Sequence, residues 1–162
     1  ALVATAIFLA LVYRVLVGRA TFGVINLFPI VVAVALLAGT MRLLGIPFNA
    51  LTATILAIAL GLGVDYSAHV VHRFTDEYDW EADERNADVI SALERTVRGT
   101  GGALTGSMIT TVSGTAILVL AITPVLGQFG LVTALSIFYS YFTAVVLTPS
   151  VVVVWARYAR RR

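Results

Sequence analysis

The sequence contains no cysteine and no lysine, and charged residues of any kind are scarce. Without cysteine the chain can form no disulfide framework, no thiolate metal site and no cysteine nucleophile. Only 12% of the 162 residues are charged, whereas 59% are hydrophobic, which is well above the apolar share of a soluble domain. The net charge of +2 is small and its arginines are spread over several loops, so the composition does not indicate nucleic-acid binding.

Five apolar runs divide the chain, and several reach the roughly 20 residues that a helix needs to cross a bilayer core. We therefore predict an all-α fold, a polytopic membrane helix bundle that forms one transmembrane domain over residues 1–162. The first run starts without methionine or a charged leader, so we expect a fragment and not a signal peptide. The predicted transmembrane helices are Ala1–Leu16, Phe22–Leu44, Ala50–Val71, Gly101–Ile122 and Phe129–Trp155.

The arginines are distributed unevenly between the two ends of these helices. If Ala1 lies outside, ten of the eleven arginines fall on the inner side and only Arg42 falls on the outer side. Cytoplasmic loops carry the excess of positive charge in membrane proteins. We therefore expect a multi-pass protein of the cell membrane with a cytoplasmic C-terminus. The ten inner residues are Arg14, Arg19, Arg73, Arg85, Arg95, Arg98, Arg157, Arg160, Arg161 and Arg162.

Residues 73–99 form the one long polar stretch, which we expect to be a cytoplasmic loop. Its acidic part, Thr75–Glu84, is typical of a solvated segment. Ala87–Arg98 has apolar and charged sides, which predicts a short amphipathic helix on the inner membrane surface; an ordinary solvated connector is the alternative. Asn86 would cap this helix and Gly99 would end it. Its apolar side would consist of Val89, Ile90, Leu93 and Val97.

The third run contains Asp65, the only acid within the apolar runs. A carboxylate at bilayer depth costs about 3 kcal/mol on insertion scales, so its presence points to a functional, titrating group. His69 follows one helical turn later and His72 two turns later, so they share a face with Asp65 and are candidates for a proton relay. Tyr66 projects about 100° away at the same depth. The alternatives are a purely structural pair for Asp65 and ordinary interfacial positions for the histidines.

Small residues recur at every fourth position in the fourth run and also precede Asp65 in the third. This GxxxG-type spacing lets helix backbones approach closely. We predict that the stripe in the fourth run packs against another helix, near the third run. The packing glycines are Gly61, Gly63, Gly102, Gly106 and Gly114.

Hydroxyl groups of the fourth run fall at about the depth of Asp65. With a rise of about 1.5 Å per residue and antiparallel directions, Ser107 lies level with Asp65, and Thr110 and Thr111 lie one turn further out. We predict that these three side chains support the relay.

The spacing of Asp65, His69 and His72 also permits metal binding, but one helix rarely supplies a complete metal site. We therefore expect no metal. The sequence shows no serine-histidine-acid nucleophile, no phosphate-binding glycine loop and no paired carboxylates, so we expect neither an enzyme nor a bound cofactor.

The segment Gly61–Tyr66 fits the pattern G-x-x-x-D-Y. It resembles the fourth and tenth transmembrane helices of the resistance-nodulation-division (RND) superfamily, in particular its MMPL branch of lipid and hydrophobe exporters. The resemblance covers nearly the whole chain. Further matching segments are His72–Phe74, Ala92–Val97 before Thr110 and Thr111, Gln128–Leu131 and Leu147–Pro149.

The resemblance implies twelve helices in two pseudo-symmetric halves, of which this chain matches the last five helices of one half. It implies export of lipids or other hydrophobic compounds driven by the proton-motive force, with Asp65 and Tyr66 in the proton relay. The implied partners are membrane lipids, the substrate, and the complementary half or a second copy. Because the extracytoplasmic substrate domain is absent, we expect no transport by this chain alone.

Two other functions stay open. Patched-like and sterol-sensing domains belong to the same superfamily and bind or sense lipids without active transport, although sterol-sensing relatives often lack the acid. An export accessory similar to SecD and SecF is the weaker alternative, because their D-A-N segment is absent: Asp65 is followed here by Tyr66 and Ser67.

Overall fold

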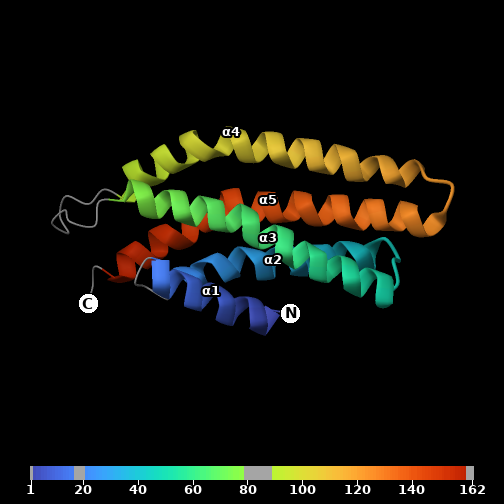
Figure 1. Cartoon of the computed structure of the whole chain (residues 1–162), viewed down its shortest axis with the longest axis horizontal. Helices are drawn as coiled ribbons and strands as arrows, with labels where there is room; N and C mark the ends of the chain where they lie inside the picture. The colour runs from blue at the N-terminus through green and yellow to red at the C-terminus, as the bar shows by residue number, and fades with distance from the viewer. Residues whose placement is uncertain (1, 17–20, 79–88, 160–162) are drawn as a thin grey trace.

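The computed structural model describes residues 2–16, 21–78 and 89–159, and every regular element in these residues is a helix. Figure 1 shows an elongated bundle in which the helices run roughly along one another. Helices α2 to α5 are long and apolar enough to cross a membrane, and α1 is a shorter apolar helix. The predicted all-α membrane bundle is therefore confirmed. The elements are α1 (Leu2–Leu16), α2 (Thr21–Leu43), α3 (Ala50–Glu77), α4 (Val89–Ala116), the 3-10 helix η1 (Ile117–Leu120) and α5 (Pro124–Ala159).

Helix α5 is the centre of the bundle, because it packs against α2, α3, α4 and η1. Two tyrosines of α5 bond to neighbouring helices: the Tyr139 hydroxyl lies 2.7 Å from Thr40 Oγ1 on α2, and the Tyr141 hydroxyl lies 2.6 Å from Thr105 Oγ1 on α4. Both threonine hydroxyls already donate to carbonyls of their own helices, so the tyrosines act as the donors. These bonds join α5 to both sides of the bundle.

The turn between α2 and α3 follows from two local signals. Gly45, with φ of 67°, ends α2 in a Schellman motif: its N–H bonds to the Arg42 carbonyl at 3.3 Å and that of Ile46 bonds to the Met41 carbonyl at 2.9 Å. Asn49 caps α3 in a capping box, accepting a bond from the Thr52 N–H at 3.0 Å. This turn and residues 121–123 form one end of the bundle, the Pro47 end; the opposite end, where α3 ends and α4 begins, is the Glu77 end (Figure 1).

The predicted separate surface helix Ala87–Arg98 is wrong, because α4 runs without a break from Val89 to Ala116. Gly99 lies inside this helix and does not end it. Among the described residues only Gly45 has a positive φ, so the glycines of α4 keep helical dihedrals instead of reversing the chain. Residues 87 and 88 and the proposed cap Asn86 lie outside the described residues.

The first turns of α4 do have one buried side, but they pack on the bundle and not flat on a membrane surface. Val89 and Leu93 are buried as predicted, in a core cluster that includes Phe22, Val71 and Phe74 of α2 and α3. Ile90 and Val97, which the sequence placed on the same side, are exposed. The buried side is completed instead by Ala92 and Thr96.

Two other helix boundaries differ from the prediction. Helix α3 continues past Val71 to Glu77, so the start of the acidic segment is helical and not part of a loop. Helix α5 begins at Pro124, five residues before the predicted Phe129. Proline suits the first position of a helix because its missing N–H needs no partner there.

Salt bridges hold the ends of α3 and α4 together at the Glu77 end. Glu77 lies 2.6 Å from Arg73 Nη2 on its own helix and 3.0 Å from Arg95 Nε on α4. Arg95 also donates to the Glu77 backbone carbonyl at 3.1 Å. The Arg73 guanidinium lies over Gly99, where an added Cβ would be 3.5 Å from Nε. This charged cluster explains why both helices extend beyond their apolar segments.

Candidate functional site

Asp65 lies near the middle of α3, fifteen residues after Ala50 and twelve before Glu77. Its side chain is 72% exposed, so its own chain leaves it uncovered. Within the described part of the chain its partner is His69, whose Nε2 lies 3.4 Å from Asp65 Oδ1. The structure therefore brings together the first two members of the predicted face of α3.

A second acid-histidine pair lies further along the same helix. His72 Nε2 is 3.9 Å from Asp76 Oδ2, and both side chains are more than half exposed. Sequence reasoning placed Asp76 in a solvated loop and missed this pair; the extension of α3 puts it one turn after His72. The i, i+4 spacing of the two residues was the signal that could have found it. Two carboxyl–imidazole pairs thus follow α3 from Asp65 toward the Glu77 end.

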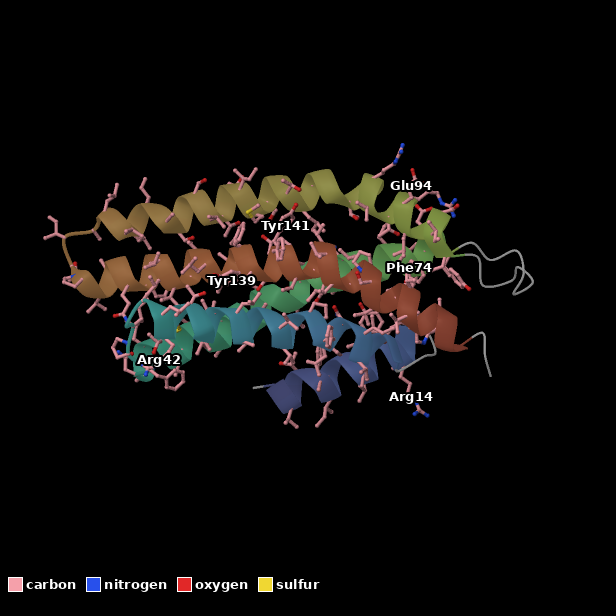
Figure 2. The ribbon with its side chains drawn as sticks, turned by 180° about the vertical axis from the view of Figure 1, so that it is seen from behind. Arg14, Arg42, Phe74, Glu94, Tyr139 and Tyr141 are labelled. Atoms are coloured by element: carbon pink, nitrogen blue, oxygen red, sulfur yellow. The ribbon has the colours of Figure 1, made fainter. Side chains whose placement is uncertain are left out.

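Tyr66 points away from this exposed face. Only 6% of the residue is exposed, and its ring meets the Tyr141 ring edge-on, with centroids 6.0 Å apart and planes at 80°. Figure 2 labels Tyr141 between the α4 and α5 ribbons. Tyr66, Leu104 and Ile137 belong to the core cluster that joins α3, α4 and α5. Asp65 and its neighbour therefore face different surroundings: Asp65 faces outward and Tyr66 faces the core.

The three predicted supporting hydroxyls lie on an exposed side of α4. Thr110 and Thr111 each donate to the carbonyl four residues back in their own helix, at 2.8 Å. No described interaction joins them or Ser107 to Asp65. The structure does not bring these residues to the carboxylate, and their supporting role stays a prediction.

The predicted packing glycines divide into two groups. An added Cβ on Gly63 would lie 3.0 Å from Ser140 Oγ, so this glycine does let α3 and α5 approach closely. The α4 stripe does not pack against α3 within the described residues, because α4 turns other residues, including Leu104, toward the core. Its packing against another helix stays a prediction. An added Cβ would meet no atom within 4 Å at Gly61, Gly102, Gly106 and Gly114.

Two other glycines, which sequence reasoning missed, make the closest backbone contacts. An added Cβ on Gly23 would lie 2.8 Å from the Ala10 backbone of α1. One on Gly130 would lie 2.6 Å from Leu118 Cβ and 2.7 Å from the Thr115 carbonyl. No repeat pattern marks either glycine, because each contact involves a single crossing point and not a stripe.

A row of buried hydroxyl residues along α5 was also missed. Their spacing of three or four residues, with one longer step, was a readable signal, since it places small side chains on one helix face. Small polar residues permit close helix packing in membranes, as the contact between Ser140 and Gly63 illustrates. The row consists of Thr133, Ser136, Ser140, Thr143 and Thr148.

The described residues contain no group of three His, Cys, Asp or Glu side chains placed to hold an ion. The described site is therefore a set of carboxyl and imidazole groups on one face of a membrane helix. Carboxyl and imidazole side chains are the groups that most often take part in proton transfer in proteins.

Long apolar helices and an acid in the middle of α3 define a multi-pass membrane protein domain. The chain belongs to the MMPL family, whose model matches residues 1–162. It is also 35% identical over 135 residues to a protein of Methanocaldococcus jannaschii described as a membrane protein. That match covers 83% of this chain and 34% of the relative, so the chain spans about a third of the relative's length.

Proposed function

We propose that the chain is the membrane part of an exporter of lipids or other hydrophobic compounds, driven by the proton-motive force, with Asp65 as its proton-relay carboxylate. The observation that carries the proposal is the position of this acid. It lies in mid-helix among apolar segments, and its own chain leaves it 72% exposed. A charged carboxylate in that position needs a partner or water, because hydrocarbon solvates it poorly.

Protonation of Asp65 changes what can surround it. The neutral acid tolerates an apolar neighbour at modest cost, whereas the charged form favours an arrangement that admits water or a polar partner. A proton gradient can therefore shift the populations of two helix arrangements, since each arrangement prefers one protonation state. This is the property that a proton-driven transporter requires of its switch.

The histidine pairs supply a route for protons along α3. His69 is in contact with Asp65, and His72 is in contact with Asp76 nearer the Glu77 end. His69 and His72 are three residues apart, about 4.5 Å along the helix axis, which one water molecule can bridge. Imidazole suits this role because one ring nitrogen can accept a proton while the other donates one. The proposed relay thus runs between Asp65 and the Glu77 end.

Tyr66 provides the connection from the switch to the rest of the bundle. Tyr66 directly follows Asp65 in α3, and its ring packs against the ring of Tyr141 on α5. The hydroxyl of Tyr141 in turn bonds to Thr105 of α4. A rotation or shift of α3 at Asp65 therefore moves a side chain that packs against α5 and is linked to α4 through Tyr141. We assign Tyr66 the role of transmitting the change, in addition to its implied place in the relay.

The uncovered side of α3 also needs a neighbour in the membrane. We assign it to the complementary half of the full-length transporter or to a second copy. Because Gly61 precedes Asp65 by one turn and has open space around it, a partner helix could approach closely at this level.

The Glu77 end is assigned to the cytoplasm, because ten of the eleven arginines fall on that side. A cysteine in place of Ile46, at the Pro47 end, should therefore react with an impermeant maleimide added to intact cells. A cysteine in place of Glu94 should react only after the cells are opened. The opposite pattern would reverse the assignment.

The function is tested with the full-length protein in liposomes that contain a fluorescent lipid. An imposed pH gradient should drive movement of the lipid across or out of the membrane, and a protonophore should stop it. Lipid binding without gradient-dependent movement would contradict the exporter and favour a Patched-like or sterol-sensing module.

A further inference from the structure

The Pro47 end carries a pocket that the proton relay does not use. It has a volume of about 320 Å³ and lies where the last turns of α2 meet the turn into α3. Ala38, Met41, Pro47 and Phe48 contribute apolar walls, and Arg42 contributes the only charged group in the lining. Figure 2 labels Arg42 at this end of the bundle. The pocket is thus apolar with one guanidinium.

No acidic residue in the described part of the chain forms an ion pair with Arg42. The acidic residues of the chain also lie far from Arg42 in the sequence. Eight of its nine acidic residues lie between positions 76 and 94, at the far end of α3 or beyond. The ninth, Asp65, is fifteen residues along α3 from Ala50, a rise of about 22 Å. Among the described residues no ion pair or side-chain hydrogen bond involves the Arg42 guanidinium. Arg42 is exposed, so its guanidinium is open to an anion from outside the described residues.

The neighbouring backbone offers no substitute for an anion. The carbonyl of Arg42 accepts from Gly45, and the carbonyl of Met41 accepts from Ile46. The Schellman motif thus already uses the carbonyl groups of Met41 and Arg42. The N–H groups of the Arg42 guanidinium therefore face the pocket without a described partner. Their planar, forked arrangement matches the oxygens of a phosphate.

The surroundings of the pocket indicate where such a phosphate comes from. Leu43 and Leu44 are exposed beside Arg42, and Phe48 is exposed on the pocket wall, with exposures of 87%, 56% and 74%. Exposed leucine and phenylalanine at the end of a membrane-spanning helix fit the boundary between acyl chains and headgroups. A soluble anion would gain nothing from these side chains, whereas a lipid would cover them.

We propose that this pocket binds an anionic phospholipid, with the phosphate on Arg42 and the glycerol and first acyl carbons against Ala38, Pro47 and Phe48. The site is independent of the proton relay, since it lies at the other end of α3 from the histidine pairs. Binding of a lipid here would hold the α2–α3 turn at the membrane interface.

Photocrosslinking of the full-length protein in nanodiscs tests the proposal. The probe is a phosphatidylglycerol with a diazirine near the start of one acyl chain, and crosslinks to the peptide spanning residues 38–48 are counted by mass spectrometry. Arg42→Gln should lower this crosslinking about fivefold, the effect of removing one interfacial cation. Arg42→Lys should recover part of it, because the charge returns without the planar fork.

Two further variants separate the pocket from its charge. Ala38→Phe should lower crosslinking although Arg42 is retained, because the ring would fill the space for the lipid. Arg98→Gln is the matched control: Arg98 is exposed on α4, 2.8 Å from Glu94, far from the pocket, and its loss should leave crosslinking to residues 38–48 unchanged.

Competition identifies the ligand. Excess unlabelled phosphatidylglycerol should remove the crosslink, whereas phosphatidylcholine and millimolar inorganic phosphate should remove little of it. Displacement by inorganic phosphate would overturn the lipid assignment in favour of a free anion. Equal crosslinking in wild type and Arg42→Gln would show that Arg42 does not hold the lipid, and would overturn the site itself. The crosslinking result does not depend on transport. A protein that fails to transport lipid in a pH gradient but still shows Arg42-dependent crosslinking would contradict the proposed export and support this lipid site.

Discussion

Asparagine in place of Asp65 should abolish gradient-driven export by the full-length protein and leave its amount in the membrane unchanged. The amide of asparagine has nearly the same shape as the carboxyl group but cannot ionise. The exchange therefore removes the group that changes charge and leaves the shape of the α3 surface almost unchanged. Because the side chain is 72% exposed and its ion-pair partner in the described structure is His69, the exchange should disturb little of the packing within the described chain. Lipid efflux should fall to the rate measured without a pH gradient.

The matched control is Glu94→Gln, which neutralises an exposed acid on α4 that bonds only to Arg98 in the described structure. It should retain wild-type export. His69→Ala should slow export less than Asp65→Asn does, because water can replace an imidazole on an exposed face. Wild-type export by the Asp65→Asn protein would remove the relay hypothesis and leave a lipid-sensing module as the better interpretation.

Local signals allowed the sequence to predict the α2–α3 turn. Gly45 ends one helix and Asn49 starts the next through bonds to residues at most five positions away, so no distant contact decides the outcome. The face shared by Asp65 and His69 was predictable for the same reason, because residues four positions apart in a helix lie on the same face.

The Glu77 end could not be predicted in this way. Acidic residues after Val71 suggested a loop, but arginine and glutamate are good helix formers, and Glu77 is held by Arg95 from α4. That salt bridge joins residues 18 positions apart. The length of α3, and with it the pairing of His72 with Asp76, therefore depends on tertiary contacts that no local pattern contains.

The glycine pattern was ambiguous for a different reason. A stripe of small residues says that something can approach a helix closely, but it does not say which helix approaches. The α4 stripe faces away from α3 and α5, whereas the isolated Gly23 and Gly130 make close contacts. The open glycines are thus identified only with the structure, which shows that the described chain places no atom within 4 Å of a Cβ added to them.

Leucine at Gly61, or at Gly106 on α4, should therefore prevent assembly and export without unfolding the chain. An added Cβ at either position meets no atom within 4 Å, so the described chain can accommodate the side chain. Replacing a helical glycine should even stabilise the helix by up to about 1 kcal/mol. A partner helix packed against the glycine would in contrast be pushed away, and at Gly61 this happens one turn from Asp65.

Gly39→Leu is the matched control, since Gly39 also has open space but lies on α2. It should leave both thermal unfolding and export at wild-type values. Gly63→Leu should behave in the opposite way and lower the unfolding temperature itself, because an added Cβ already lies 3.0 Å from Ser140 Oγ. Thermal unfolding in detergent and export in liposomes, measured for all four variants, separate the two effects. Normal export by both Gly61→Leu and Gly106→Leu would show that these glycines face lipid, and the partner surface would then have to lie elsewhere on the bundle.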